Sequence, residues 1–541
     1  MSVTTLRKVF CIRNLLIRSA AHKKTSYLHN QVTLPLTDQP TIIMIGILLF
    51  LFVQAIPAEL FPTNARLGNE CCCQELLSSL PGLVAHPADT RYNSSLKSYW
   101  STQEQALLPY CIVLPRNSED VSRVVTVLTA SNSTSPCRFA IRGGGHASFS
   151  GAANINAGVT IDLQVLNEVT FSANKSVVHI GGGSRWGHVY KTIVPARKAI
   201  LGGSVGVPGL VTAGGYSYFS ARYGFVFDCV SNFEVVLANG TLVSANAVSN
   251  AQLYRAHKGG QNNFGIVTRF DMRTFDQGDL WSGTWIHPVS ASSSSFMAFE
   301  NFANSQNNDM DAALISTLTA TSKSTWTLSS TMKYAQPIPR PQAFSEFFKL
   351  STIQHSEEIG NLTALTAGEP LGEPGYRWLS ATATYANNAT MMEAFFKLAN
   401  QTVQQLPSDP AFSFSLSYQP LTKNMASQGA RFGGNSYGLE NLEQDHAIYV
   451  VNLRWSSAEN DNVNDDLIRD LFTASDVAAQ SMGLYHPLKY TNYASLWQNP
   501  ISTYGNQNIK ELWDVSKEYD PQQIFQERVP GGFKLPKLPL V

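Results

Sequence analysis

The sequence predicts an α+β fold in two parts, and three observations support this. Residues 111–275 alternate short β-rich runs with glycine-rich loops. In residues 281–484 the glycines thin out, and alternating strands occur with amphipathic helices, which is typical of an antiparallel sheet flanked by helices. Residues 485–541 return to aromatic, Asn- and Gly-rich sequence. The predicted organisation is an N-terminal extension at 1–58, a first domain at 70–278, a second domain at 279–484, and a segment at 485–541 that completes the first domain.

The first part begins with a strand at CIVLP, Cys111–Pro115. Asn117 or Ser118 can cap a helix over residues 119–130, whose apolar residues recur at helical spacing. FAIR, at residues 139–142, is the next strand. Further strands are predicted at 159–163, 176–183, 232–245 and 265–275, with a hairpin turn at 238–241.

The second part shows alternation over residues 325–335, 412–421 and 448–455, which predicts strands. Residues 391–406 and 463–482 are amphipathic at helical spacing. Strands and helices in this order favour an α+β domain with an antiparallel sheet flanked by helices.

An apolar run at residues 42–53 is too short for a membrane span, which needs about 20 residues, but fits the core of a secretory signal. Ala55 and Ala58 suit a cleavage site. Met44 would be a more ordinary start, so residues 1–43 are a candidate extension of the gene model. We expect a secreted protein; the alternative is a retained signal anchor in the secretory-pathway membrane.

Export agrees with the sequons and the cysteines. An oxidising compartment favours disulfides among Cys71–Cys73, Cys111 and Cys137, whose pairing the sequence leaves open, and these would fasten the N-terminal segment to the first domain. No cysteine or histidine spacing indicates a metal site, so no metal is expected. The predicted N-glycan acceptors are Asn93, Asn132, Asn174, Asn239, Asn361, Asn388 and Asn400.

Charged residues make up 14% of the chain, against roughly 25% in typical soluble domains. The 39 basic side chains equal the 39 acidic ones, so the net charge is zero. This composition gives no reason to expect nucleic acid or a stable membrane partner. The expected partners are a small-molecule substrate and O2, and the chain is expected to be a monomer.

The glycine-rich loops lack the fingerprints of dinucleotide-binding and P-loop folds, and no H-E-x-x-H is present. G-x-S-x-G occurs at 202–206 and 434–438, but neither has the strand and helix that a nucleophile elbow requires. If five of these loops converge, their backbone N–H groups would bind a pyrophosphate. The alternative explanation for the glycines is a twisted sheet with tight turns. These loops are RGGGH (142–146), IGGGS (180–184), LGGSVGVPG (201–209), TAGGYS (212–217) and KGGQNNFG (258–265).

RGGGH followed by SFSGAAN resembles the flavin-attachment loop of the vanillyl-alcohol oxidase / p-cresol methylhydroxylase (PCMH) superfamily, and more closely its berberine-bridge-enzyme-like branch of fungal secreted FAD oxidases. The resemblance extends over about residues 71–535. It implies a PCMH-type FAD-binding domain split around a substrate domain. The other segments that carry it are 205–228, 253–270, 490–495, 504–526 and 529–535.

The resemblance implies that FAD is bound covalently through His146. Many relatives add a cysteine link just ahead of V-G-V-G-G, but this stretch has no cysteine, so a single link is expected. Pro208 and Cys229 depart from the usual pattern, where the family has Gly and Asn, and we expect a slight shift of the loops that carry them. The implied flavin contacts are Arg142, Gly143, Gly144, Gly145, Ser150, Val205, Gly206, Gly209, Thr212, Gly214, Gly215, Tyr223, Asn263, Gly265, Ile266, Val267, Asn492 and Asn506.

Tyr493 matches the tyrosine that accepts a substrate proton in several relatives, and we predict it as general base. A tyrosine pKa is normally near 10, so a cation or the flavin would have to lower it. The alternatives are a carboxylate from the middle domain as base, or a packing tyrosine bonded to the cofactor. Four aromatics are candidates for lining the substrate cleft, or simply for core packing: Tyr376, Trp378, Tyr418 and Trp455.

The predicted function is an FAD-linked oxidase that moves hydride from a small organic substrate to flavin and returns the electrons to O2 as H2O2. The substrate is predicted to be a small hydrophobic compound of secondary metabolism. The alternatives are a carbohydrate or alcohol oxidase of the same fold, a flavin-binding protein without turnover, and a hydrolase that uses Ser204.

Overall fold

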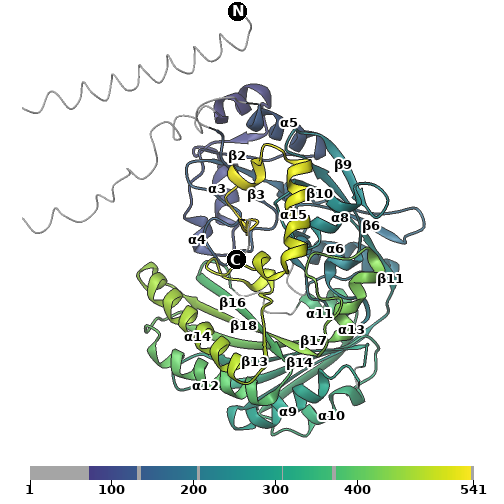
Figure 1. Cartoon of the computed structure of the whole chain (residues 1–541), viewed down its shortest axis with the longest axis vertical. Helices are drawn as coiled ribbons and strands as arrows, with labels where there is room; N and C mark the ends of the chain where they lie inside the picture. The colour runs from purple at the N-terminus through teal and green to yellow at the C-terminus, as the bar shows by residue number, and fades with distance from the viewer. Residues whose placement is uncertain (1–71, 131–135, 204–207, 307–308, 368–372, 538–541) are drawn as a thin grey trace, which may run out of the picture.

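A computed structural model describes residues 72–130, 136–203, 208–306, 309–367 and 373–537. The chain forms an upper part from residues 72–278 and the C-terminal segment, and a lower part built on one large sheet (Figure 1). The prediction of an α+β fold with an antiparallel sheet is confirmed. No helix within the described ranges is long and apolar enough to cross a bilayer.

A four-stranded sheet begins the upper part, in the order β1-β2-β4-β3. β2, β4 and β3 run parallel, and α5 connects β2 to β3. Asn117 caps α5 by accepting a hydrogen bond from the backbone N–H of Asp120 at 2.8 Å, as predicted. The elements are β1 (Val84–Ala85), α3 (Thr90–Lys97), α4 (Thr102–Gln105), β2 (Cys111–Val113), α5 (Ser118–Thr129), β3 (Phe139–Arg142) and β4 (Val159–Asp162).

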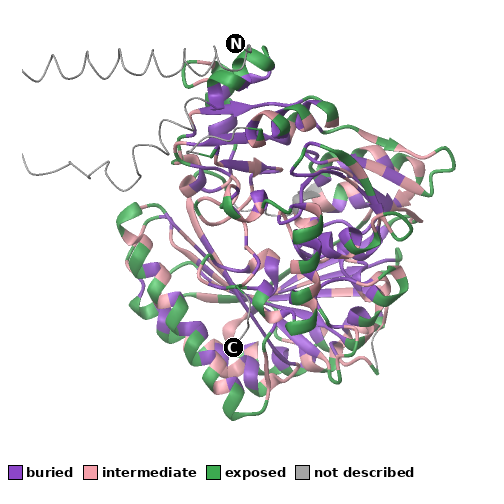
Figure 2. Ribbon diagram, turned by 45° about the horizontal axis from the view of Figure 1, so that its top comes forward, coloured by how far each residue is buried: buried purple, intermediate pink, exposed green. Residues whose placement is uncertain are grey.

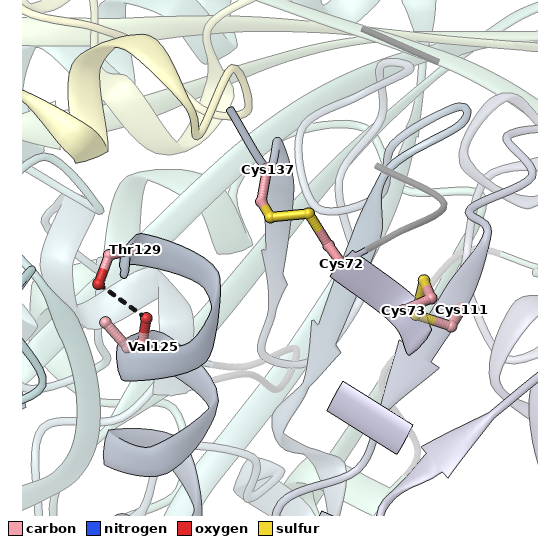
Figure 3. Close-up of a disulfide and its surroundings, with 6 residues drawn as sticks. All are labelled: Cys72, Cys73, Cys111, Val125, Thr129 and Cys137. Carbon is pink, nitrogen blue, oxygen red and sulfur yellow. Dashed lines mark hydrogen bonds between the residues drawn. A yellow bond between two sulfur atoms is a disulfide. The ribbon is translucent and has the colours of Figure 1, made fainter. Parts of the chain in front are cut away.

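Two disulfides fasten the helical residues 72–79 to this sheet (Figure 3). Cys73 is bonded to Cys111 in β2, and Cys72 to Cys137 just before β3. The predicted fastening of the N-terminal segment is therefore present, with a pairing that the sequence left open. Cys71 lies outside the described residues.

A second, antiparallel sheet follows in the order β5-β6-β10-β8-β9. The predicted turn at Asn239 joins β8 to β9, where the Asn239 side chain accepts from the backbone N–H of Thr241 at 2.9 Å. The elements here are β5 (Val169–Phe171), β6 (Val177–Gly181), α6 (Trp186–Ile193), β7 (Lys198–Ala199), α7 (Ser220–Tyr223), β8 (Val230–Val236), β9 (Leu242–Asn246), α8 (Ala251–His257), β10 (Ile266–Arg273) and β11 (Phe275–Asp276).

The large sheet has eight strands in the order β15-β12-β14-β13-β17-β18-β16-β19. Helices α9, α12 and α14 cover one of its faces (Figure 1), and much of the sheet beneath these helices is buried (Figure 2). The elements are β12 (Leu280–Pro288), α9 (Ser292–Phe302), β13 (Ala312–Ala320), β14 (Trp326–Tyr334), α10 (Ser345–Phe348), β15 (Gln354–Gly360), α11 (Leu362–Ala367), β16 (Arg377–Ala386), α12 (Ala389–Gln405), β17 (Ser413–Leu421), α13 (Lys423–Ser427), β18 (His446–Trp455), α14 (Asp461–Ser481) and β19 (Tyr485–His486).

The C-terminal segment returns to the upper part, where α15 (Asn506–Tyr519) packs on α8 and α16 (Ile524–Glu527) follows. The backbone N–H of Phe139 donates to the carbonyl of Arg528 at 2.9 Å. The side chain of Asn263 donates to the carbonyl of Phe533 at 2.9 Å. Residues nearly 400 positions apart in the chain thus form one body, shown in purple and yellow in Figure 1.

Candidate active site

His146 lies near the start of the loop between β3 and β4, four positions after the end of β3, and is half-buried. The ring stacks on the indole of Trp100, with centroids 4.4 Å apart and planes inclined by 12°. Trp100 in turn stacks on Trp378, at 4.3 Å and 23°. Because Trp378 stands at the start of β16, this column of three rings links the upper part to the large sheet.

Arg142 turns away from the loop into the sheet. Its guanidinium is buried, donates to Asp162 at 3.1 Å and to the carbonyl of Ser95 at 2.6 Å, and covers the ring of Tyr99. Gly145 adopts φ +66°, and a Cβ there would lie 2.8 Å from the Arg142 guanidinium. The glycine is therefore needed so that the chain can turn around this buried charge.

Glu104 in α4 fixes the segment after the histidine. Its buried carboxyl accepts from the backbone N–H groups of Gly151 at 3.1 Å and Ala153 at 2.6 Å. Burial raises its pKa to about 7, against the opposing effect of these two bonds. Ser150, a predicted flavin contact, is exposed and donates to the carbonyl of Gln103 at 3.3 Å.

Several of the other glycines serve close packing between parts of the chain. A Cβ on Gly183 would lie 1.8 Å from the carbonyl oxygen of Leu163, so the IGGGS loop packs directly on another backbone. A Cβ on Gly214 would meet Tyr437 and one on Gly215 would meet Val226. These contacts support the tight-packing alternative for IGGGS and TAGGYS. Gly265, a predicted flavin contact, is similarly crowded against β8.

The other predicted flavin contacts are spread more widely. Asn263 is buried and holds the C-terminal tail, and Asn492 donates to the carbonyl of Leu210 at 3.3 Å. Tyr223 packs against Phe275 in the upper core. Asn506, at the first position of α15, is exposed. The remaining positions are Gly143 and Gly144 in the histidine loop, Gly209 and Thr212 in the turn Pro208–Ala213, Ile266 and Val267 in β10, and Val205 and Gly206 outside the described residues.

Tyr493 ends a short 3-10 turn, Thr491–Tyr493, and reaches toward the large sheet. Its hydroxyl accepts from the side-chain amide of Gln419 in β17 at 3.1 Å. Burial raises the pKa of Tyr493, and the hydrogen bond from Gln419 only partly opposes this. Among the described residues no cation contributes to this shift, so this part of the chain supplies nothing that would lower the Tyr493 pKa as a base requires.

Strand pairing places Trp378, which stacks on Trp100, and Gln419, which binds Tyr493, on the same face of the large sheet. Trp378 pairs with Arg454 of β18, and Gln419 pairs with Ile448 of the same strand. Arg454 and Ile448 are six positions apart (454 − 448), an even number, so their side chains share a face, roughly 20 Å apart along the strand. The His146 column and Tyr493 therefore approach two points of one surface, which we call the upper face of the large sheet.

The four candidate aromatics divide between the two faces. Tyr376 and Trp378 lie beside the Arg454 guanidinium, at 4.8 and 5.9 Å from their ring centroids, on the upper face. Tyr418 is fully buried against Tyr449 under the helices, and Trp455 is also buried in that core. Tyr418 and Trp455 are therefore core residues and do not line a cleft.

Sequence reasoning missed two residues of this site. Gln419 occupies the polar register of FSFSLSYQPL, so the alternation carried a signal that its side chain shares a face with the serines. Trp100 lies outside every motif, and no spacing indicates that it meets His146.

Cys229, the single cysteine outside a disulfide among the described residues, is buried, and burial raises its thiol pKa to about 12.

The residues around the histidine loop fit an FAD. The hydroxyl of Ser184 is buried and has no hydrogen-bond partner among the described residues, which suits a polar ligand atom. The guanidinium of Arg185 donates to the carbonyl of Gly144 at 3.3 Å and places a positive charge beside the loop, which suits a diphosphate. The half-buried imidazole of His146 keeps its ring nitrogens at the edge of the stack.

Comparison with known proteins gives the following relatives. A family profile described as an FAD binding domain matches residues 109–246. The FAD-dependent monooxygenase tpcD of Cochliobolus heterostrophus is 35% identical over 523 residues, which are 91% of this chain and 99% of that protein.

Two solved structures share the fold at low identity. BBE-like 1 of Physcomitrella patens has a TM-score of 0.69 at 18% identity, covering 86% of this chain and 99% of that one. Glucooligosaccharide oxidase of Acremonium strictum, whose description names a 6-S-cysteinyl, 8α-N1-histidyl FAD, has a TM-score of 0.69 at 15% identity, covering 86% and 98%.

Proposed function

Because the chain belongs to the family of fungal FAD-dependent monooxygenases and berberine-bridge-enzyme-like oxidases, we propose that it oxidises a small organic substrate with FAD held covalently by His146. The observation that carries the proposal is the placement of His146 and Tyr493 against one face of the large sheet. The bound flavin would accept hydride from the substrate and pass the electrons to O2, giving H2O2. We place the reaction in secondary metabolism, with a small hydrophobic substrate.

A single covalent link is the form that this sequence supports. The Acremonium strictum oxidase is described with both a cysteinyl and a histidyl bond. Here residues 201–209 contain no cysteine, and the thiol of Cys229 is buried in the upper core. His146 alone would therefore hold the flavin.

Tyr493 and Gln419 would act on the substrate. The amide of Gln419 fixes the direction of the Tyr493 hydroxyl, and the raised pKa of that hydroxyl favours a neutral tyrosine that donates a hydrogen bond to a substrate oxygen. The role of general base, predicted from the resemblance, requires an ionised tyrosine. Tyr493→Phe separates the two: loss of a base lowers kcat by about a hundredfold or more and removes a limb of the pH profile, whereas loss of an orienting bond costs less and leaves the profile's shape.

The test of the proposed function is chemical. The purified protein is precipitated with acid, digested and analysed for a fluorescent peptide that contains His146. We expect flavin to stay with the peptide in the wild type and to wash out of His146→Ala. Colour that leaves the wild-type protein completely would overturn covalent attachment.

Monooxygenation is the second candidate, because tpcD of Cochliobolus heterostrophus is described as an FAD-dependent monooxygenase. A monooxygenase places one oxygen atom of O2 in its product, whereas an oxidase releases both as H2O2. Turnover under 18O2, with H2O2 measured in parallel, distinguishes them. Candidate substrates are found first by anaerobic bleaching of the flavin with aromatic alcohols, polyketides and sugars.

We further propose that the protein is a secreted, monomeric glycoprotein. The two disulfides suit an oxidising compartment. Asn388 is half-buried and caps α12, so it is the least suited of the sequons that the structure describes, and Asn132 lies outside the described residues. Removal of N-glycans, followed by a gel shift, tests glycosylation. The asparagines with exposed side chains are Asn93, Asn174, Asn239, Asn361 and Asn400.

A further inference from the structure

Trp100 contacts the predicted attachment residue and the residue just before it. Its indole lies nearly parallel to the imidazole of His146, and its backbone N–H donates to the carbonyl of Gly145 at 2.9 Å. Its own carbonyl accepts from the backbone N–H of Gly375 at 3.2 Å. One residue thus holds the ring of His146, the loop beside it, and the chain that leads into β16.

The indole of Trp100 contacts a face of the imidazole and not the edge that carries the ring nitrogens. The lone pair and the N–H of an imidazole lie in the plane of the ring, whereas Trp100 covers a face. A parallel contact at 4.4 Å therefore restricts the tilt of the His146 ring without blocking either nitrogen at its edge. This is what a nucleophile needs when it must meet one carbon atom from a defined direction.

The second face of Trp100 is supported from the other part of the molecule. Trp378 stacks there, and its backbone is held by two hydrogen bonds to the side chain of Gln103, at 2.8 and 3.2 Å. Gln103 belongs to α4, whose Glu104 binds the segment after His146. The indole of Trp100 is therefore held on both faces by elements that are themselves fixed.

On the basis of the proposed function, we propose that Trp100 is a positioning residue for covalent attachment of the flavin to His146, with Trp378 as its support. In that step an imidazole nitrogen bonds to the 8α carbon of FAD, and one C–H bond of the methyl group and the imidazole N–H bond break. The two electrons and two hydrogens stay on the flavin ring, and O2 then accepts them as H2O2.

The experiment compares covalent with total flavin. Wild type and the variants Trp100→Leu, Trp100→Phe, Trp378→Leu and His146→Ala are purified. Total bound flavin is read from absorbance, and covalent flavin from fluorescence of the denatured protein on a gel, over time after addition of FAD. Trp326, a half-buried tryptophan of β14, provides the matched control Trp326→Leu.

We expect Trp100→Leu to bind FAD but to attach it roughly ten- to a hundredfold more slowly than wild type, since misplacement of about 1 Å costs this much in rate. Trp100→Phe keeps a flat ring and should recover most of the rate of covalent attachment. If Trp100 only filled space, the smaller phenylalanine would not be expected to restore that rate. Trp378→Leu should slow attachment less, and Trp326→Leu should attach at the wild-type rate.

Each failure has a separate meaning. Wild-type rates in Trp100→Leu, with covalent flavin present in the wild type, overturn this inference and leave the proposed function standing. Equal slowing in Trp100→Leu, Trp100→Phe and Trp326→Leu also overturns it, because the effect would then follow general destabilisation. Absence of covalent flavin from the wild type overturns both proposals.

Discussion

The face of the large sheet under α9, α12 and α14 is apolar, whereas the upper face carries hydroxyl and amide side chains. In β17, Phe414, Leu416 and Tyr418 are fully buried under the helices, and the intervening Ser415 and Ser417 are half-buried on the other side. The same strands therefore serve two purposes. One face supplies packing energy, and the other is left with polar groups that can meet a ligand.

Phe395 tests the packed face and should give the largest effect. Its ring is fully buried in α12, with centroids 5.2 Å from Tyr449 and 5.5 Å from Phe472. Phe395→Ala should lower the free energy of unfolding by about 3–5 kcal/mol through the cavity it leaves. Guanidinium unfolding measures this. Phe396→Ala, at the half-buried neighbour, is the matched control and should cost less; the reverse order would contradict the assignment of faces.

Gln419 tests the upper face. Gln419→Leu removes the partner of the half-buried Tyr493 hydroxyl, which should cost about 1–3 kcal/mol of stability. It should also lower kcat by about tenfold or more, because the hydroxyl loses its direction. Steady-state kinetics and unfolding together measure both effects. Full activity with reduced stability would show that the contact only packs the two parts together.

The histidine pair at the end of the upper face predicts a dependence of stability on pH. The rings of His446 and His486 meet edge to face at 4.6 Å. Burial and the neighbouring His446 lower the pKa of His486 to about 4, and burial lowers that of His446 although Asp445 opposes this. Both imidazoles are therefore neutral in the folded protein at a pH where the unfolded chain binds protons.

Stability should fall as the pH drops from about 6.5 toward 4, by about 1–2 kcal/mol from this pair after allowance for partial exposure. Unfolding free energies measured over that range, for the wild type and the double variant His446→Gln/His486→Gln, measure the contribution. The double variant should show a shallower slope. An unchanged slope would assign the pH dependence to other groups.

Ser415 should give the smallest effect. Ser415→Ala removes a half-buried hydroxyl from the upper face and should change stability by less than about 0.5 kcal/mol. The next residue, Leu416, is fully buried on the other face, and Leu416→Ala should cost about 2–5 kcal/mol. Thermal unfolding of these two variants compares the stability change on the two faces of the sheet. Similar changes in Ser415→Ala and Leu416→Ala would contradict the difference between the faces.

Periodicity predicted several elements that have one buried and one open side, although β13, whose burial alternates at every residue, and β12 were missed. β14, β17, α12 and α14 lie where the sequence placed them, and so does β18, although its first six residues are all buried. β16 was missed because its residues from Ala381 to Ala386 are small or aromatic and buried on both faces, so no alternation marks it. β15 was missed for the opposite reason, since nearly all of its residues are exposed.

The candidate site was predictable only where a motif carries it. His146 and Tyr493 came from the resemblance of their segments to a known family. Trp100 did not, because its role depends on a contact with Trp378, which lies 278 positions further along the chain (378 − 100). That five glycine loops surround a ligand stays a prediction, and Gly183 and Gly214 show that chain packing also requires glycine in two of these loops.

The tail around Gly531 lies so close to Gly151 and Ala152 that a Cβ on it would be 2.4 Å from the carbonyl of Ala152. The ribosome adds Gly151 to the chain 380 positions before it adds Gly531 (531 − 151). The contact between tail and loop can therefore form only after the tail has left the exit tunnel. A stop codon just before residue 529 would yield an almost full-length polypeptide in which the segment after His146 lacks this contact.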